Sequence, residues 1–249
     1  MAIPIGLQLY SVRDDCARDL PGTLEAVAKM GYTGVEFAGY HGYGADDLRK
    51  MLDGLGLTCY GTHTAIDALL GDEFAATVEF SLALGNPYPV VPWLAEERRG
   101  SRAAWLESAE LFNGIAERLK PHGLRTGYHN HMVEFTPMEG ETPWDTFFGN
   151  ASPDVIMQLD TGNAMRGGGD PVPFVERYPG RATTVHLKEF SATDDKALIG
   201  EGDVDWDRLF NLCETAGGTQ WYIVEQESYA HEPLKCVELC LEALRAMGK

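Results

Sequence analysis

The sequence has few basic residues for its length, and this limits the partners that the protein can bind. Its 249 residues include 20 Lys and Arg against 38 Asp and Glu, a formal net charge of −18. DNA and anionic membranes repel such a surface, because nucleic-acid affinity comes largely from cationic side chains that displace phosphate counterions. The dense basic cluster at Arg98, Arg99 and Arg102 adjoins Glu96 and Glu97 and is typical of a solvated helix start. We therefore expect no nucleic-acid partner.

Cysteines and long apolar runs are also scarce. The five cysteines are odd in number and share no Cys-x-x-Cys spacing, which favours buried thiols in a reducing compartment over a disulfide scaffold. No stretch approaches the ~18 apolar residues that a membrane-spanning helix needs. The first ten residues lack the basic start and long apolar run of a signal peptide. The sequence thus predicts a cytoplasmic protein with no membrane partner.

Short apolar runs alternate with longer amphipathic stretches along the whole chain. Eight runs are expected to form strands: Ile5–Tyr10, Gly34–Ala38, Thr58–His63, Tyr88–Trp93, Arg125–His131, Val155–Asp160, Ala182–Lys188 and Trp221–Gln226. Eight helices are expected to begin near Leu20, Ala45, Asp72, Ser101, Pro143, Pro171, Asp205 and Glu232. Eight strand–helix pairs in ~250 residues predict an α/β fold of the (β/α)₈ TIM-barrel type. Because no linker divides the chain, we expect one domain over residues 1–249.

Ionisable side chains stand where most of the expected strands end. They are Glu36, His63, His129, His131, Asp160, His186 and Glu225. Parallel strands buried on both faces are normally apolar, and a buried carboxylate or imidazole is costly unless it is paired or bound to a metal. The carboxyl ends of barrel strands converge, and active sites of this fold lie there. Oxygen and imidazole ligands together predict a divalent metal: Mn²⁺, Zn²⁺, Co²⁺ or Fe²⁺, and less readily Mg²⁺.

The segments around these residues carry a resemblance to a known family. Asp160 lies in Gln-Leu-Asp-Thr-Gly-Asn, His186 in Val-His-Leu-Lys and Glu225 in Ile-Val-Glu-Gln-Glu. With the strand-five segment Tyr128-His-Asn-His-Met-Val-Glu134, they resemble the xylose isomerase-like TIM-barrel superfamily over essentially the whole chain. The resemblance is greatest to its sugar phosphate isomerase/epimerase branch, which includes inosose isomerases and dehydratases and keto-sugar epimerases. More distant DNA-repair endonucleases have a His where this chain has Asn163, and the net charge also disfavours that function.

The resemblance implies one divalent metal, held by Glu, Asp, His and Glu on strands five to eight. Asp160, His186 and Glu225 match this pattern directly, and Mn²⁺ is the preferred ion. Strand five departs from it, because His-Asn-His stands where relatives commonly have Glu-Asn-His. Alignment on the shared Asn puts His129 at the ligand position, and we favour it slightly over Glu134, the competing ligand.

The same resemblance places His131 where relatives that abstract a sugar proton keep a base. Imidazole titrates near neutral pH, and a metal that holds the carbonyl and adjacent hydroxyl oxygens stabilises an enediolate as it forms. Glu134 or Glu225 is the candidate for a second acid/base group. The implied function is isomerisation or epimerisation of a keto-sugar or keto-cyclitol.

Lys188 and several other polar or aromatic residues complete the expected site. Lys188 follows His186 by two residues and so points to the same side, where it could bind a hydroxyl or phosphate or hold an acid. An ion pair with Glu189 or Glu201 is an equal alternative. The residues expected to contact the substrate are Glu36, His63, Trp93 and Asn163.

A second candidate reaction, β-elimination, begins with the same proton abstraction. If a β-substituent then leaves, the enzyme is a lyase or hydratase acting on 3-keto-glycosides or inososes. The His-Asn-His segment favours this alternative, since family members that handle 3-keto sugars resemble it there. A non-catalytic barrel is disfavoured by the intact ligand pattern, and a homo-oligomer is compatible with the sequence.

Overall fold

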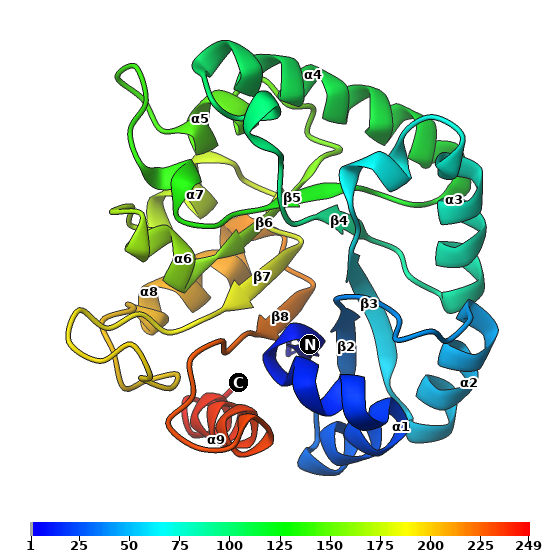
Figure 1. The fold of residues 1–249 in the computed structure, drawn as a ribbon. Helices are drawn as coiled ribbons and strands as arrows, with labels where there is room; N and C mark the ends of the chain where they lie inside the picture. Colours follow the sequence, from blue (N-terminus) through cyan, green and yellow to red (C-terminus); the bar gives the residue numbers. More distant parts are fainter. Residues whose placement is uncertain (1) are drawn as a thin grey trace.

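Eight parallel strands close into a barrel, in sequence order, in the computed structural model, which describes residues 2–249 (Figure 1). The strands are β1 (Ile5–Gln8), β2 (Gly34–Phe37), β3 (Thr58–His63), β4 (Pro89–Val91), β5 (Gly127–His129), β6 (Ile156–Asp160), β7 (Thr184–Leu187) and β8 (Trp221–Val224). The helices are α1 (Arg13–Met30), α2 (Ala45–Leu55), α3 (Glu73–Leu84), α4 (Arg102–Leu119), α5 (Pro143–Phe148), α6 (Thr161–Arg166), α7 (Val172–Arg177), α8 (Trp206–Leu212) and α9 (Pro233–Ala246). They surround the strands, which confirms the predicted (β/α)₈ barrel.

Several short helical turns follow the strands at their carboxyl ends. These are the 3₁₀ turns η1 (Leu9–Val12), η2 (Ile66–Leu69), η3 (Glu96–Arg98) and η5 (Val133–Phe135). The first helix begins earlier than expected and breaks at Asp19, whose φ of −157° and ψ of 86° are not helical. Pro21 then lies in the first turn after the break, where its missing N–H costs no helical hydrogen bond. The expected start near Leu20 therefore marks only the second part of α1.

Four strands end two residues earlier than their apolar patterns predict. In β1, β4, β5 and β8 the ladder stops before Tyr10, Trp93, His131 and Gln226, respectively. At these points the chains diverge toward their helices, so parallel pairing cannot continue. The side chains expected at strand ends therefore lie at the beginnings of loops, around the mouth of the barrel.

The amino-terminal end of the barrel interior is filled by an aromatic side chain. Tyr60 is fully buried, and its ring stacks on Trp221 with centroids 4.5 Å apart. A Cβ atom at Gly6 would lie 2.1 Å from this ring, so β1 needs glycine at that position. The polar interior is consequently confined to the carboxyl-terminal end.

A second aromatic cluster holds β5 from outside. The buried Tyr128 ring packs against Phe147 of α5 at 5.3 Å and against Trp105 and Phe112 of α4 at 5.7 and 5.8 Å. Because strand side chains alternate, Tyr128 faces the helices while His129 faces the barrel interior. The outer packing thus fixes the direction of His129.

The cysteines and the apolar content of the helices can be compared with the predictions. All five cysteines are buried free thiols, as the sequence predicts. Among the helices of residues 2–249, none is both long and apolar enough to cross a membrane.

Candidate functional site

Ionisable side chains form an inner cluster and an outer set at the carboxyl ends of β5 to β8. We define the inner cluster as His129, Asp160, His186 and Glu225, and the outer set as His131, Lys188 and Glu227. Each outer residue follows an inner one by two positions and lies just beyond the end of its strand. This spacing stacks the outer set between the inner cluster and the barrel mouth.

The inner cluster is compact and buried. Each of its four residues offers one ligand atom, and these atoms all lie within 4.8 Å of one another. Each of the four residues is at most 4% exposed. Carboxylate oxygens and imidazole nitrogens at this spacing form a donor set that suits a divalent transition metal. The structure thus brings together the four residues that the sequence singles out.

Two atoms of the inner cluster are buried without a hydrogen-bond partner. The Asp160 Oδ1 atom accepts a hydrogen bond from the Asn163 backbone N–H at 2.7 Å, whereas Asp160 Oδ2 has no donor. The His129 Nδ1 atom is also unpartnered. Burial raises the pKa of Asp160 to about 6 and lowers that of His129 well below its usual value. Since an unpaired buried polar atom is costly, a cation shared by the cluster fits these residues.

His186 lies between two buried carboxylates. Its Nε2 atom is 2.7 Å from Glu36 Oε2, and its Nδ1 atom is 2.5 Å from Glu225 Oε2. Burial lowers the pKa of His186, but Glu36 and Glu225 outweigh burial and raise this pKa to about 10. With Nε2 held by Glu36, Nδ1 is the atom that can face a cation. A metal at Nδ1 would replace the proton shared with Glu225.

Glu36 lies beneath the inner cluster and does not line the cavity above it, which differs from the expectation that it contacts the substrate. Its side chain is fully buried, and besides His186 it accepts a hydrogen bond from Gln158 Nε2 at 3.0 Å. Burial raises the pKa of Glu36, but the neighbouring His63 and His186 outweigh burial and lower the pKa overall. Gln158 was missed by the sequence analysis, although it precedes Asp160 by two residues and therefore shares its face.

A cavity of about 330 Å³ opens above the inner cluster. It is lined by Tyr10, Ala38, His63, Pro92, Trp93, His129, His131, Glu225 and Glu227. In a closed barrel with sequential strand order, β4 lies opposite β8, so Trp93 faces the two glutamates across the cavity. His63, Trp93 and His131, for which the sequence predicts a place near the substrate, all line this cavity. The volume is within the range of small-molecule sites.

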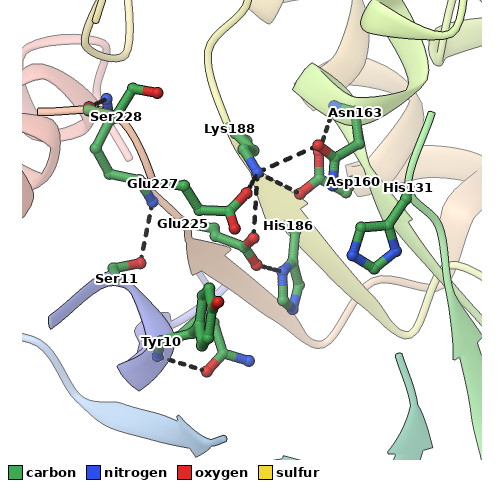
Figure 2. A network of polar contacts seen from close by, with 12 residues as sticks. Tyr10, Ser11, His131, Asp160, Asn163, His186, Lys188, Glu225, Glu227 and Ser228 are labelled. Atoms are coloured by element: carbon green, nitrogen blue, oxygen red, sulfur yellow. Dashed lines mark hydrogen bonds and ion pairs between the residues drawn. The ribbon is translucent and has the colours of Figure 1, made fainter. Parts of the chain in front are cut away.

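His131 presents an imidazole that makes no hydrogen bond through its buried Nδ1 atom. Figure 2 shows this ring beside the polar network, with no dashed contact. Its edge-to-face contact with Trp93 has a centroid distance of 5.0 Å, and Arg99 stacks on Trp93 from 4.2 Å. Burial lowers the pKa of His131 to about 4, which keeps the ring neutral at neutral pH.

Glu134 lies behind the cavity, outside the inner cluster. Its Oε1 atom accepts a hydrogen bond from the Tyr128 hydroxyl at 2.6 Å, and Oε2 accepts one from the His131 N–H at 2.8 Å. Burial raises the pKa of this carboxyl. The structure therefore differs from the expectation of Glu134 as a ligand or acid/base group, because the chain after β5 turns away from the cluster. Glu134 instead holds the backbone that carries His131.

Lys188, a member of the outer set, contacts both the inner cluster and Glu227 (Figure 2). Its Nζ atom donates to Asn163 Oδ1 at 3.2 Å and Glu225 Oε1 at 3.3 Å, contacts Glu227, and lies 4.0 Å from Asp160 Oδ2. Lys188 and Asn163 are buried and do not line the cavity, so Asn163 differs from its expected place at the substrate. Glu227 was missed, although it follows Glu225 by two residues.

The two alternative partners of Lys188 are engaged elsewhere. Glu189 accepts hydrogen bonds from the Gly200 N–H at 2.7 Å and from the Trp206 indole at 2.9 Å, which fixes the loop after β7. Glu201 accepts one from the Leu198 N–H at 2.9 Å. The network of Lys188 is therefore confined to the candidate site.

The fold and the site together define a TIM barrel with a candidate divalent-metal centre at its carboxyl-terminal face. Comparison with known families agrees with this class and narrows it. Residues 24–247 match the xylose isomerase-like TIM barrel family, and the chain belongs to that family. The resemblance seen in the sequence is thereby confirmed.

Curated relatives and solved structures resemble this chain at low sequence identity. An inosose dehydratase of Erwinia tasmaniensis is 25% identical over 179 residues, which cover 64% of this chain and 59% of the relative. The match to an inosose dehydratase of Clostridium tetani spans 47% of that protein, about half its length. The rhizopine catabolism protein MocC of Rhizobium meliloti is 23% identical over 100% of this chain and 89% of its own. A sugar phosphate isomerase/epimerase structure from Parabacteroides distasonis has a TM-score of 0.86 and 27% identity, covering 99% and 94% of the two chains.

Proposed function

We propose that the protein is a divalent-metal-dependent enzyme that removes the proton beside the carbonyl of a keto-sugar or keto-cyclitol. Protonation at the neighbouring carbon then gives an isomer, and protonation of the same carbon from the opposite face gives an epimer. The observation that carries the proposal is the buried Asp160 Oδ2 atom, which accepts no hydrogen bond and lies among three further ligand atoms directly below a cavity. The substrate class comes from relatives named inosose dehydratase and sugar phosphate isomerase/epimerase. The buried free thiols are compatible with work in the cytoplasm.

In this proposal the inner cluster holds one cation, with Mn²⁺ as the preferred ion. His129, Asp160 and Glu225 supply three ligand atoms, and His186 supplies Nδ1. A bound divalent cation polarises the carbonyl and adjacent hydroxyl oxygens and so raises the acidity of the carbon-bound proton between them. Glu36 keeps the His186 ring in place from the opposite nitrogen.

His131 is the proposed base. Its imidazole lines the cavity and makes no side-chain hydrogen bond that would hold it away from a substrate, so it is the group placed to accept the proton. The Glu134 carboxylate fixes the His131 backbone, and Trp93 fixes the plane of the ring. The enzyme therefore presents the base in a defined orientation from one side of the cavity.

A second candidate function is β-elimination, acting on inososes or 3-keto-glycosides. Glu227 lines the cavity and contacts the Lys188 ammonium. It follows β8, whereas His131 follows β5, so the two side chains reach the cavity from different strands. When His131 takes the proton and the β C–O bond breaks, the departing oxygen can receive a proton relayed from Lys188 through Glu227. The curated relatives named dehydratase favour this outcome.

Proton exchange in deuterated water tests both candidates together. Mn²⁺-loaded protein is incubated in D₂O with an inosose and with a 3-keto-glucoside, and the products are followed by NMR. We expect deuterium beside the carbonyl, and loss of this exchange after chelation. A new keto isomer or epimer supports the first candidate, whereas release of water or aglycone supports the second. Absence of both deuterium exchange and product formation with the inosose and the 3-keto-glucoside would contradict the proposed function.

Replacement of Glu36 by glutamine tests the support beneath the metal site. Glu36 holds the His186 nitrogen opposite the one that faces the cluster. We expect Glu36→Gln to weaken Mn²⁺ binding by about 10- to 100-fold, as is typical when the partner of a metal-binding imidazole is lost. Competition with a chromophoric chelator measures this affinity. Glu107→Gln on the exposed side of α4 removes the same charge as a control, and equal affinities in the two variants would contradict the assignment.

A further inference from the structure

A second cavity, of about 460 Å³, adjoins the candidate active site. Its walls come from the loops after β2 and β3, from η2 and from one side of α3. His63 lines both cavities, and Ala38 of the first is followed in the chain by Gly39 of the second. The two spaces therefore adjoin at His63.

The second cavity has the chemistry of an apolar binding groove. Small side chains, Ala65, Ala68 and Ala76, leave it open, and Tyr40 and Phe80 pack together in it with ring centroids 4.3 Å apart. Glu73 is the one carboxylate among its lining residues. Such a surface offers little to sugar hydroxyls, but it suits a planar apolar group that stacks on aromatic rings.

The groove is held open by hydrogen bonds between its walls. The Thr77 hydroxyl of α3 donates to the Ala68 carbonyl of η2 at 2.6 Å, which ties the two elements together. The Ala68 N–H in turn donates to the Ala65 carbonyl at 3.0 Å. Because these walls are fixed in advance, an occupant orders little of the chain when it binds.

We propose that the substrate is a keto-sugar glycoside whose aromatic aglycone lies in this groove. This inference rests on the proposed function and specifies its substrate class. A free keto-sugar or inosose would fill only the cavity above the inner cluster. A glycoside can place its sugar there and extend past His63 into the apolar space, where the aglycone gains hydrophobic contact.

A tryptophan placed in the groove tests this inference. Ala75 and Ala76 are both exposed residues of α3. Ala76 lines the groove, and Ala75 does not. We expect the natural protein to have a KM for p-nitrophenyl 3-keto-glucoside on the order of tenfold below that for the methyl glycoside, since a buried ring contributes hydrophobic free energy. Ala76→Trp should abolish this preference. Ala75→Trp should retain the preference.

Binding of p-nitrophenyl glucoside, measured by calorimetry, gives a readout that does not require turnover. We expect Ala76→Trp to weaken this binding and Ala75→Trp to leave it unchanged. Turnover of the methyl glycoside without any aromatic preference would overturn the inference and leave the proposed function standing. If no keto-sugar reacts, the proposed function fails, and equal binding by both tryptophan variants would then overturn the groove independently.

Discussion

Replacement of Asp160 by asparagine is expected to remove tight metal binding from the protein. The carboxylate supplies Oδ2, which is buried and unpartnered, while Oδ1 caps α6. In Asp160→Asn the amide oxygen can keep the cap, because Asn is as good an N-cap as Asp. The amide NH₂ then points at the cluster and repels a cation. Since a cation contributes several kcal/mol of charge stabilisation, turnover should fall by about 10²- to 10⁴-fold.

A matched control separates the metal from the helix cap. Asp205 caps α8 by accepting a hydrogen bond from the Arg208 N–H, outside the candidate site. Asp205→Asn should keep full metal content by elemental analysis and full turnover. An Asp160→Asn protein that binds Mn²⁺ as tightly as the natural chain would show that the cluster is not the metal site.

Replacement of His131 by alanine is expected to stop proton abstraction without releasing the metal. His131 belongs to the outer set and is not part of the ligand group, so Mn²⁺ affinity should be unchanged. Loss of a general base typically costs about 10²- to 10⁴-fold, and deuterium exchange should slow by this factor. Added imidazole should restore part of the rate, because a small base can occupy the vacated space.

Exchange rate and metal content must be measured on the same His131→Ala preparation. His122→Ala, at an exposed position after α4, serves as the control and should behave like the natural protein. Full exchange in a His131→Ala protein that retains its metal would exclude this residue as the base.

The barrel and the inner cluster were predictable because they depend on sequence periodicity. Strand–helix alternation fixes the fold, and a polar residue at the end of an apolar run must lie at the barrel mouth. Asp160, His186 and Glu225 follow this rule, and alternation places His129 inward beside them. Local pattern placed these residues at the barrel mouth, and the resemblance to the xylose isomerase-like superfamily singled them out as candidate ligands.

The depth of a side chain was not predictable, because period two gives the face of a strand but not its height in the barrel. Glu36 reads like the other strand-end residues, yet the pairing of β2 with β3 shifts in register between Val35 and Glu36. Its carboxylate contacts His186 from below the cluster. The place of the Glu134 side chain depends on the path of the loop after β5. The contacts of Lys188 depend on which carboxylates the neighbouring strands bring close to it. These contacts are set by tertiary structure.

Crystals of the protein grown with Mn²⁺ and measured at the manganese absorption edge test the central claim most directly. The account predicts one anomalous peak per chain, bonded to His129, Asp160, His186 and Glu225, with Glu134 still hydrogen-bonded to Tyr128. A peak coordinated by Glu134 in place of His129 would contradict the ligand assignment. No peak among these four residues would contradict the metal centre itself.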